Sequence, residues 1–336
     1  MTTLSKQQMP SQIRVSTGTA TVLKLKNDKL DAAPTTAYLM TYHDGKCAAN
    51  CAFCPQARAS QSSAEQLSRV TWPTYPTDTV LQKLEKLTQE GRIKRVCIQA
   101  LNYTSVFDDI CAIVEQLKSR VSVPVSISCQ PFNAENMWVL AEAGVDRIGI
   151  ALDAATESLF DKVKGACAGG PYRWRDVQTL LRVAVGVFGE GNVSTHLIVG
   201  LGETEKELIQ TVQDCVDIGV LPALFAFTPI RGTALAAQNQ PAVDVYRRIQ
   251  LARYLIVGGF AKAEDMLFDD AGRVVDFGIS KPKLLTMVET GLPFLTSGCP
   301  SCNRPFYNEK PSGPLYNYPR SISPAELKQI KRELNL

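Results

Sequence analysis

From residue 37 onward, the chain alternates short apolar runs with longer amphipathic stretches. Short runs of β-branched and apolar residues are typical of buried strands, whereas apolar residues spaced three and four apart are typical of helices. We predict strands at 37–43, 94–100, 123–129, 146–152, 193–200 and 222–228. We predict helices at 77–91, 106–119, 133–143, 174–188, 203–218 and 241–257. This alternation indicates an α/β protein with parallel strands and crossover helices.

The number of strand–helix units favours an α/β fold of the (β/α)8 TIM-barrel type, complete or partial. Two weaker runs, 262–268 and 274–279, are candidates for the last two strands. The alternative is an incomplete barrel of six strands with a C-terminal cap. We divide the chain into an N-terminal extension (1–36), a barrel (37–290) and a cysteine-containing cap with a terminal helix (291–336). In such barrels, functional residues lie at the C-terminal ends of strands and in the loops that follow.

The composition narrows the class of protein. The 336 residues are 45% hydrophobic and 21% charged, which is typical of a soluble globular protein. A net charge of +3 is too small to indicate binding to nucleic acid or to a membrane surface. The chain has no apolar run long enough to span a membrane, and its N-terminus lacks the apolar core of a signal peptide. We therefore expect a cytoplasmic protein whose ten cysteines are ligands or buried residues rather than disulfides.

The clearest chemical signal is the segment Cys47-Ala-Ala-Asn-Cys51-Ala-Phe-Cys54, which follows the first predicted strand. Thiolates are soft ligands that favour iron–sulfur clusters. Three of them can bind three irons of a [4Fe–4S] cube and leave the fourth iron open for a ligand that is not a side chain. A structural zinc site is the alternative, but such sites use four closed ligands, and no second cysteine pair lies nearby.

Four further cysteines predict a second metal site. Cys97 lies within the second predicted strand and Cys129 ends the third, and neighbouring parallel strands lie about 4.8 Å apart. Cys299 and Cys302 form a Cys-x2-Cys pair in a long irregular segment that has little core of its own. These four thiols are enough to close a second [4Fe–4S] cluster over the barrel mouth. The strand cysteines could instead be core residues, and the pair could be a redox dithiol or half of a zinc site shared across a dimer.

The triplet, with Phe53 just before its last cysteine, resembles the motif of the radical S-adenosylmethionine (SAM) enzymes. The resemblance implies that Cys47, Cys51 and Cys54 bind a [4Fe–4S] cluster, and that the amino and carboxylate groups of SAM bind its open iron. It also implies an electron donor such as ferredoxin or flavodoxin. Transfer of the electron cleaves SAM to a 5′-deoxyadenosyl radical, which abstracts a hydrogen from the substrate.

Much of the barrel resembles biotin synthase, from about residue 37 to 235. This resemblance implies that Asp153 contacts the ribose of SAM and that Arg175 pairs with its carboxylate. It implies a glycine-containing turn near the adenine, formed by Ile198, Gly200 and Glu203. Asp153 could equally be a helix cap, and Arg175 a surface ion pair.

Two departures from biotin synthase are informative. Ser194 stands where that family has a third cysteine ligand of its sulfur-donating [2Fe–2S] cluster, and Ala151 replaces an asparagine that contacts ribose. Cys97 and Cys129 match the other two cysteine ligands. The C-terminal cysteine pair offers replacement thiols, which convert the site toward a [4Fe–4S] cluster. A second, sacrificial [4Fe–4S] cluster is the sulfur donor of lipoyl synthases.

The barrel, combined with the segments Cys-Pro-Ser-Cys-Asn-Arg-Pro and Tyr-Asn-Tyr-Pro, looks similar to one subunit of the two-protein lipoyl synthases described mainly in archaea. The resemblance implies sulfur insertion into an octanoyl group on a lysine of a carrier protein or domain, shared with a second, related radical SAM subunit. The sulfur-donating cluster would be bound by Cys97, Cys129, Cys299 and Cys302.

Two alternatives remain open at this stage. The first is another radical SAM activity, either biotin synthase-like or that of a mutase or methylase. The second is a non-enzymatic protein in which the cysteines hold a structural metal. Both histidines lie near predicted strand ends. We expect His196 to face the barrel mouth, with a role in the core or in supporting the site as the open alternative, and the sequence assigns no role to His43.

Overall fold

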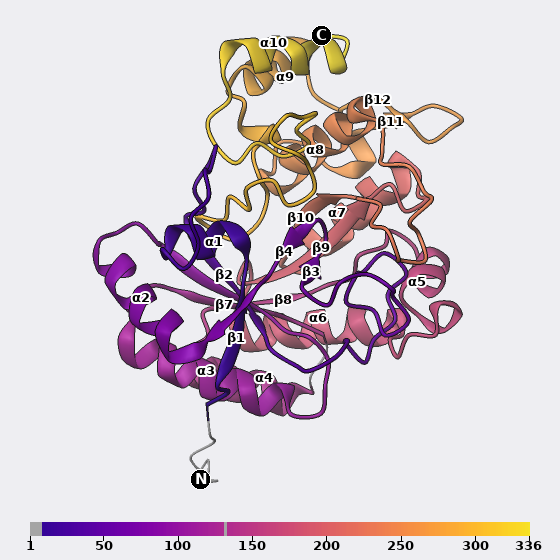
Figure 1. Ribbon diagram of the computed structural model, residues 1–336. Coiled ribbons are helices and arrows are strands. Elements are labelled where there is room, and N and C mark those ends of the chain that lie inside the picture. Colours follow the sequence, from indigo (N-terminus) through magenta and orange to yellow (C-terminus); the bar gives the residue numbers. More distant parts are fainter. Residues whose placement is uncertain (1–8, 131–132) are drawn as a thin grey trace.

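An eight-stranded sheet organises the computed structural model, which describes residues 9–130 and 133–336 (Figure 1). Its strand order is β10-β9-β8-β7-β6-β2-β1-β5. All pairs from β2 to β10 are parallel. The parallel strands are β2 (Thr36–Thr41), β6 (Arg95–Gln99), β7 (Val125–Cys129), β8 (Arg147–Ile150), β9 (Val193–Val199) and β10 (Val220–Ala226). They confirm the six predicted strand–helix units.

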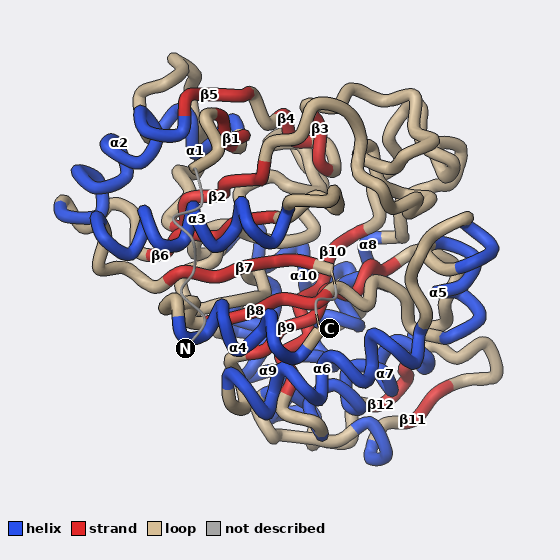
Figure 2. The backbone as a smooth tube through the Cα atoms, turned by 90° about the horizontal axis from the view of Figure 1, so that it is seen from below, coloured by secondary structure: helices blue, strands red, loops and turns tan. Residues whose placement is uncertain are grey.

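The crossover helices also lie where the amphipathic pattern predicts them. They are α2 (Thr77–Gln89), α3 (Val106–Arg120), α4 (Ala134–Glu142), α6 (Trp174–Phe188), α7 (Glu205–Asp217) and α8 (Val243–Val257). Figure 2 shows α3, α4 and α6 against one face of the parallel strands. The short helix α5 (Glu157–Val163), which follows β8, was not predicted. The other helical segments are α1 (Thr17–Val22), η1 (Ala166–Ala168), η2 (Ala263–Asp265), α9 (Lys281–Glu289), η3 (Leu292–Phe294) and α10 (Pro324–Glu333).

The two faces of the parallel strands have different surroundings. On β6, Val96 and Ile98 are completely buried in the large apolar core that the helices cover. Because side chains alternate along a strand, Cys97 and Gln99 point to the opposite, inner face. There Cys97 packs beside a small cluster that contains Tyr38 and Met40 of β2. The inner face is therefore where the sheet can hold a site.

A complete (β/α)8 barrel is not confirmed. The sheet reaches eight strands by adding β1 (Gln12–Val15) and β5 (Thr74–Pro76), which pair antiparallel beside β2. The prediction of barrel strands at 262–268 and 274–279 was wrong, because β11 (Leu267–Phe268) and β12 (Val274–Asp276) form a separate antiparallel ribbon. Another short ribbon joins β3 (Gln66–Leu67) to β4 (Val70–Thr71). The parallel part fits the six-stranded alternative.

The C-terminal segment returns to the start of the chain, as Figure 1 shows for the yellow loops beside α1. The Thr35 amide donates to Asn303 Oδ1 at 3.1 Å, and the Thr36 hydroxyl donates to the Ser301 carbonyl at 2.9 Å. These bonds hold the Cys-x2-Cys segment against the first residues of β2. The expectation about a signal peptide falls on residues 1–8, which lie outside the described residues. Across the described parts of the chain, the helices are too short or too polar to cross a membrane.

Candidate active site

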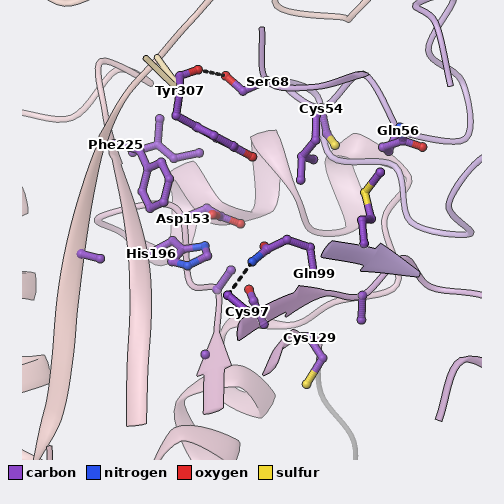
Figure 3. Close-up of a pocket in the computed structure, with 18 of the residues that line it drawn as sticks. Cys54, Gln56, Ser68, Cys97, Gln99, Cys129, Asp153, His196, Phe225 and Tyr307 are labelled. Atoms are coloured by element: carbon purple, nitrogen blue, oxygen red, sulfur yellow. Dashed lines mark hydrogen bonds between the residues drawn. The ribbon is translucent and has the colours of Figure 1, made fainter. Parts of the chain in front are cut away.

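A cavity of about 250 Å³ lies on the inner face of the sheet, between the parallel strands and the C-terminal segment (Figure 3). All six parallel strands contribute to its wall, together with the loops that follow them. Most of the lining is apolar, and thiols, one carboxylate and one guanidinium are placed within it. Apolar walls with a few convergent polar groups are typical of small-molecule sites.

The predicted cysteine triplet lies in the loop after β2 and faces this cavity. Backbone hydrogen bonds fix the loop: the Cys47 amide donates to the Gln56 carbonyl at 3.0 Å, and the Cys54 amide donates to the Cys51 carbonyl at 3.0 Å. All three thiols are free of disulfides and line the cavity. The structure therefore brings together the three residues that the motif singles out.

The surroundings of the triplet fit an iron–sulfur cluster. Burial raises the pKa of the Cys54 thiol to about 12 and raises that of Cys51 further still, so both thiolates need a positive partner to stabilise them. Cys47 Sγ accepts hydrogen bonds from the backbone amides of Ala49, at 3.5 Å, and Asn102, at 3.2 Å. Amides aimed at a sulfur stabilise thiolate charge in such clusters.

The spacing of these thiols bears on the zinc alternative. Among the described residues, no three His, Cys, Asp or Glu side chains converge closely enough to hold a single metal ion. A zinc ion holds its thiolates only about 2.3 Å from one centre. The choice between zinc and a cluster rests on the cysteine motif rather than on these positions.

A second group of thiols gathers across the cavity from the C-terminal segment. Cys299 and Cys302 enter from the Cys-x2-Cys turn, in which the Cys302 amide donates to the Cys299 carbonyl at 2.9 Å. They approach Cys97 closely enough that, after burial, their charges are the next largest cause of its raised pKa. Polar groups surround the three sulfurs: Gln99 Nε2 donates to Cys97 Sγ at 3.2 Å, and the Tyr38 hydroxyl lies 3.4 Å from Cys302 Sγ.

Cys129 is not brought together with this group. It ends β7 and contributes to the cavity wall, but it packs with Val125 and Ile127 in the helix-covered core. Burial alone raises the pKa of its thiol to about 12, with no contribution from another cysteine. Figure 3 shows its sulfur directed away from Cys97. The reason is the strand register, which places Ser126, rather than Cys129, beside Cys97.

Asp153 lies at the centre of the cavity wall and is paired with a lysine that sequence reasoning missed. Its backbone has a φ of +68°, a left-handed conformation that is uncommon outside glycine and occurs at functional sites. Lys164 follows α5, is completely buried, and donates from Nζ to Asp153 Oδ2 at 2.6 Å. The same ammonium group lies 5.2 Å from the centre of the Tyr172 ring and donates to the Ala151 carbonyl. A short helix without a clear apolar period gave no signal for this residue.

Only some of the other predicted SAM contacts reach the cavity. Phe53 and Ile198 line the cavity. Arg175 does not: its side chain is 88% exposed and lies 3.9 Å from Glu157 on the surface, as the ion-pair alternative predicts. The Glu203 carboxylate accepts hydrogen bonds from the backbone amides of its own turn, including Gly200 at 2.6 Å.

The C-terminal segment contributes a half-buried cation, Arg304, that was not anticipated. The Arg304 guanidinium stacks 3.8 Å from the centre of the Phe225 ring and donates to the Ser297 carbonyl. In the described parts of the chain, Arg304 forms no ion pair with a carboxylate. Tyr307 and His196 complete this aromatic side of the cavity, which confirms that His196 faces the mouth. His43 stacks on Tyr103 instead.

Comparisons with known proteins agree with this geometry. The family model described as "Radical SAM superfamily" matches residues 42–215, more than half of the chain. The biotin synthase of Synechococcus elongatus is 22% identical over 228 residues, covering 66% of this chain and 67% of that protein. The biotin synthase of Coxiella burnetii is 23% identical over 218 residues, covering 63% of this chain and 63% of that protein. The chain thus spans about two thirds of the length of these relatives.

Solved structures support the fold alone, because their identity to this chain is low. Methylornithine synthase matches with a TM-score of 0.52 and 13% identity, covering 66% of this chain and 62% of that one. The hydrogenase maturase HydG of Carboxydothermus hydrogenoformans matches with a TM-score of 0.51 and 13% identity, covering 72% of this chain and 56% of that one. The chain belongs to the radical SAM superfamily, whose enzymes use a [4Fe–4S] cluster, SAM and an electron donor.

Proposed function

We propose that this radical SAM enzyme inserts sulfur into an unactivated C–H bond. The observation that carries the proposal is that two groups of three cysteines line one cavity. We assign Cys47, Cys51 and Cys54 to the cluster that binds SAM. When bound, this cluster supplies the electron that cleaves SAM to a carbon radical.

Asp153 and Lys164 are proposed to position SAM beside that cluster. Asp153 is retained as the ribose contact, because its carboxylate is held rigidly in the cavity wall. The exposure of Arg175 argues against its pairing with the SAM carboxylate. Lys164 is fully buried and does not itself line the cavity, so we propose that it acts by holding Asp153 in place and by its charge near Cys51. Phe53 and Ile198 are proposed to pack against SAM, with Gly200 and Glu203 shaping the turn behind it.

The second group of thiols is proposed to bind the cluster that donates sulfur. An alkyl radical is short-lived, so the donor must lie within the same closed cavity as the radical source. Cys97, Cys299 and Cys302 meet this requirement. The cap segment that carries Cys299 and Cys302 also covers the cavity and thereby excludes water from the radical chemistry.

We propose a protein-bound octanoyl-lysine as the substrate, in lipoyl cofactor biosynthesis. An eight-carbon chain has no polar group for a protein to recognise, and the cavity walls near the second thiol group are apolar, including Met40, Trp72 and Phe225. The remaining partners are an octanoylated carrier protein or domain and a second, related radical SAM subunit that shares the two insertions. An electron donor such as ferredoxin or flavodoxin supplies the reducing equivalents.

Arg304 favours a second candidate, a biotin synthase-like reaction. A half-buried guanidinium that lines the cavity and has no carboxylate ion-pair partner among the described residues is suited to a substrate that carries a carboxylate. The relatives named biotin synthase add to this possibility. Against it, Ser194 lines the cavity at the position of a missing cysteine ligand.

The test is a product assay in oxygen-free conditions. The reconstituted protein is incubated with SAM, a reductant and either an octanoyl-lysine peptide or dethiobiotin, and thiolated products are identified by mass spectrometry. We expect a thiolated octanoyl product both in incubations that contain the related subunit and in incubations that lack it. The matched control is a Cys299→Ala, Cys302→Ala double variant, which should still cleave SAM but form no thiolated product.

Two results would overturn the proposal. Thiolation of dethiobiotin alone would favour the biotin synthase-like candidate, with Arg304 as the substrate contact. A colourless, anaerobically purified protein with stoichiometric zinc and no iron would favour a structural metal protein instead.

A further inference from the structure

A second cavity, of about 220 Å³, lies beside the first, between the start of α1, strand β4 and the C-terminal segment. Four side chains line both cavities: Tyr38, Trp72, Arg304 and Tyr307. No more than one layer of side chains therefore separates the two cavities. Leu30 and Thr71 line the second cavity and are exposed, so this cavity reaches the surface of the protein.

Hydrogen bonds hold the wall of the second cavity in place. Arg69 Nη1 donates to the Phe306 carbonyl at 3.0 Å and to the Glu309 carbonyl at 2.7 Å. The Ser68 hydroxyl donates to the Tyr307 carbonyl at 3.2 Å (Figure 3). These bonds join the turn between β3 and β4 to the C-terminal segment. The second cavity is therefore built by the fold and is not a gap between loops that lack contacts.

The size of the first cavity leaves little room for a tethered substrate. The proposed function places both SAM and the end of an octanoyl chain in a space of about 250 Å³. Pockets for one drug-sized ligand are typically about 300–1,000 Å³. The lysine side chain and the amide bond that join the octanoyl group to its carrier therefore need a separate path. The second cavity offers one between the first cavity and the surface.

The lining of the second cavity is suited to a neutral amide. Arg69 and Arg304 line it, and among the described residues no carboxylate does. Trp72 is 1% exposed, and its indole Nε1 has no hydrogen-bond partner in the described parts of the chain. Buried indole donors usually have a partner, and an amide carbonyl is an acceptor of the kind that these groups lack. The ammonium group of an unmodified lysine would instead meet two like charges.

We infer that the second cavity binds the acylated lysine of the substrate, with its amide bond beside Trp72. The octanoyl chain then passes between the four shared side chains into the first cavity. The inference rests on the proposed function, from which it takes the class of substrate. It adds a selectivity that the proposed function does not contain, because this cavity accepts a neutral, acylated lysine and disfavours a charged one.

The test measures binding of a fluorescein-labelled octanoyl-lysine peptide by fluorescence anisotropy. The full-length, anaerobically reconstituted protein is used with SAM and without reductant, so no turnover occurs. Ala32→Trp fills the second cavity, and Ala33→Trp is the matched control, because Ala33 is exposed and does not line the cavity. We expect Ala32→Trp to weaken binding by at least about tenfold, since loss of two buried methylene contacts has that effect. Ala33→Trp should bind the peptide like wild type.

Thr71→Asp tests the selectivity, because it adds a carboxylate to the lining at an exposed position. Wild type should bind the octanoyl peptide at least about tenfold more tightly than the same peptide with an unmodified lysine. Thr71→Asp should reduce this ratio by strengthening the binding of the unmodified peptide. An unchanged ratio would overturn the inferred selectivity. Thermal unfolding shows whether each variant is folded.

The outcomes separate the inference from the proposed function. Equal binding of the octanoyl peptide by folded Ala32→Trp and by wild type would overturn the inference, as would no binding by wild type. If wild type forms no thiolated product but peptide binding still depends on position 32, the proposed function fails and the lysine site stands. If product forms and Ala32→Trp keeps the wild-type KM for the peptide, the proposed function stands and the lysine site fails.

Discussion

The buried pair of Asp153 and Lys164 gives the sharpest prediction for a single substitution. Changing Lys164 to Met keeps a side chain of similar length but removes the charge 2.6 Å from Asp153 Oδ2. The lysine side chain is fully buried and that of the aspartate is 9% exposed, so water cannot replace the lost partner. Breaking such a pair from one side destabilises a protein by about 3–5 kcal/mol. We expect about 3 kcal/mol, the lower end of this range, for Lys164→Met.

The assay is urea unfolding of the metal-free protein at pH 7, followed by circular dichroism. Arg175→Met is the matched control, since Arg175 is 88% exposed and its pair with Glu157 spans 3.9 Å. It should change the free energy of unfolding by less than about 0.5 kcal/mol. Adding Asp153→Asn to Lys164→Met removes the unpaired carboxylate and should recover at least about 1 kcal/mol. Equal, small effects of the two single variants would refute the view that this pair is buried and coupled.

The remaining predictions concern SAM, pH and the turn after β9. Lys164→Gln should weaken SAM binding by at least about tenfold, as loss of a charged hydrogen bond does, whereas Arg175→Ala should not change it. If equilibrium binding instead shows that Arg175→Ala weakens SAM binding and Lys164→Gln does not, Arg175 is again the candidate for pairing with the SAM carboxylate. Burial lowers the pKa of His196 to about 4 from 6.5. Stability from neutral His196 is therefore complete above pH 6.5 and lost as the pH falls toward 4. Between pH 7 and pH 4, the free energy of unfolding of wild type should fall by about 2 kcal/mol more than that of His196→Gln in urea titrations. This is less than the full pKa shift implies, because the side chain faces a cavity. Gly200→Ala should destabilise by about 1–3 kcal/mol, because φ is +98° and the new Cβ would lie 2.9 Å from Pro241; unchanged thermal unfolding would contradict this.

Hydrophobic periodicity predicted the parallel strands and their crossover helices, because each strand is a short apolar run and each helix has one apolar face. The same reasoning failed at 262–268 and 274–279, since a short apolar run looks alike in a barrel strand and in a surface ribbon. It also missed β1 and β5. β1 pairs with β2, and β5 pairs with β1. Both pairings join residues that are far apart in the chain, which periodicity does not report.

The cysteine triplet was visible in the sequence because its ligands are local, within one loop. The second group depends on strand register and on the path of the C-terminal segment, so Cys97 and Cys129 looked equivalent before their faces were known. Lys164 was missed because the seven-residue helix before it is too short to show a period. Arg175 was assigned by resemblance, and its exposure shows that a matching residue type near the right loop is not enough.

The central claim is that Cys47, Cys51 and Cys54 hold a cluster with one iron open to SAM. The most direct measurement is the electron paramagnetic resonance spectrum of the reduced, oxygen-free protein before and after SAM is added, together with the amount of 5′-deoxyadenosine formed. We predict a changed spectrum and accumulation of 5′-deoxyadenosine, both lost when the three cysteines are replaced by alanine. An unaltered spectrum with no 5′-deoxyadenosine from the iron-loaded wild type would contradict the claim.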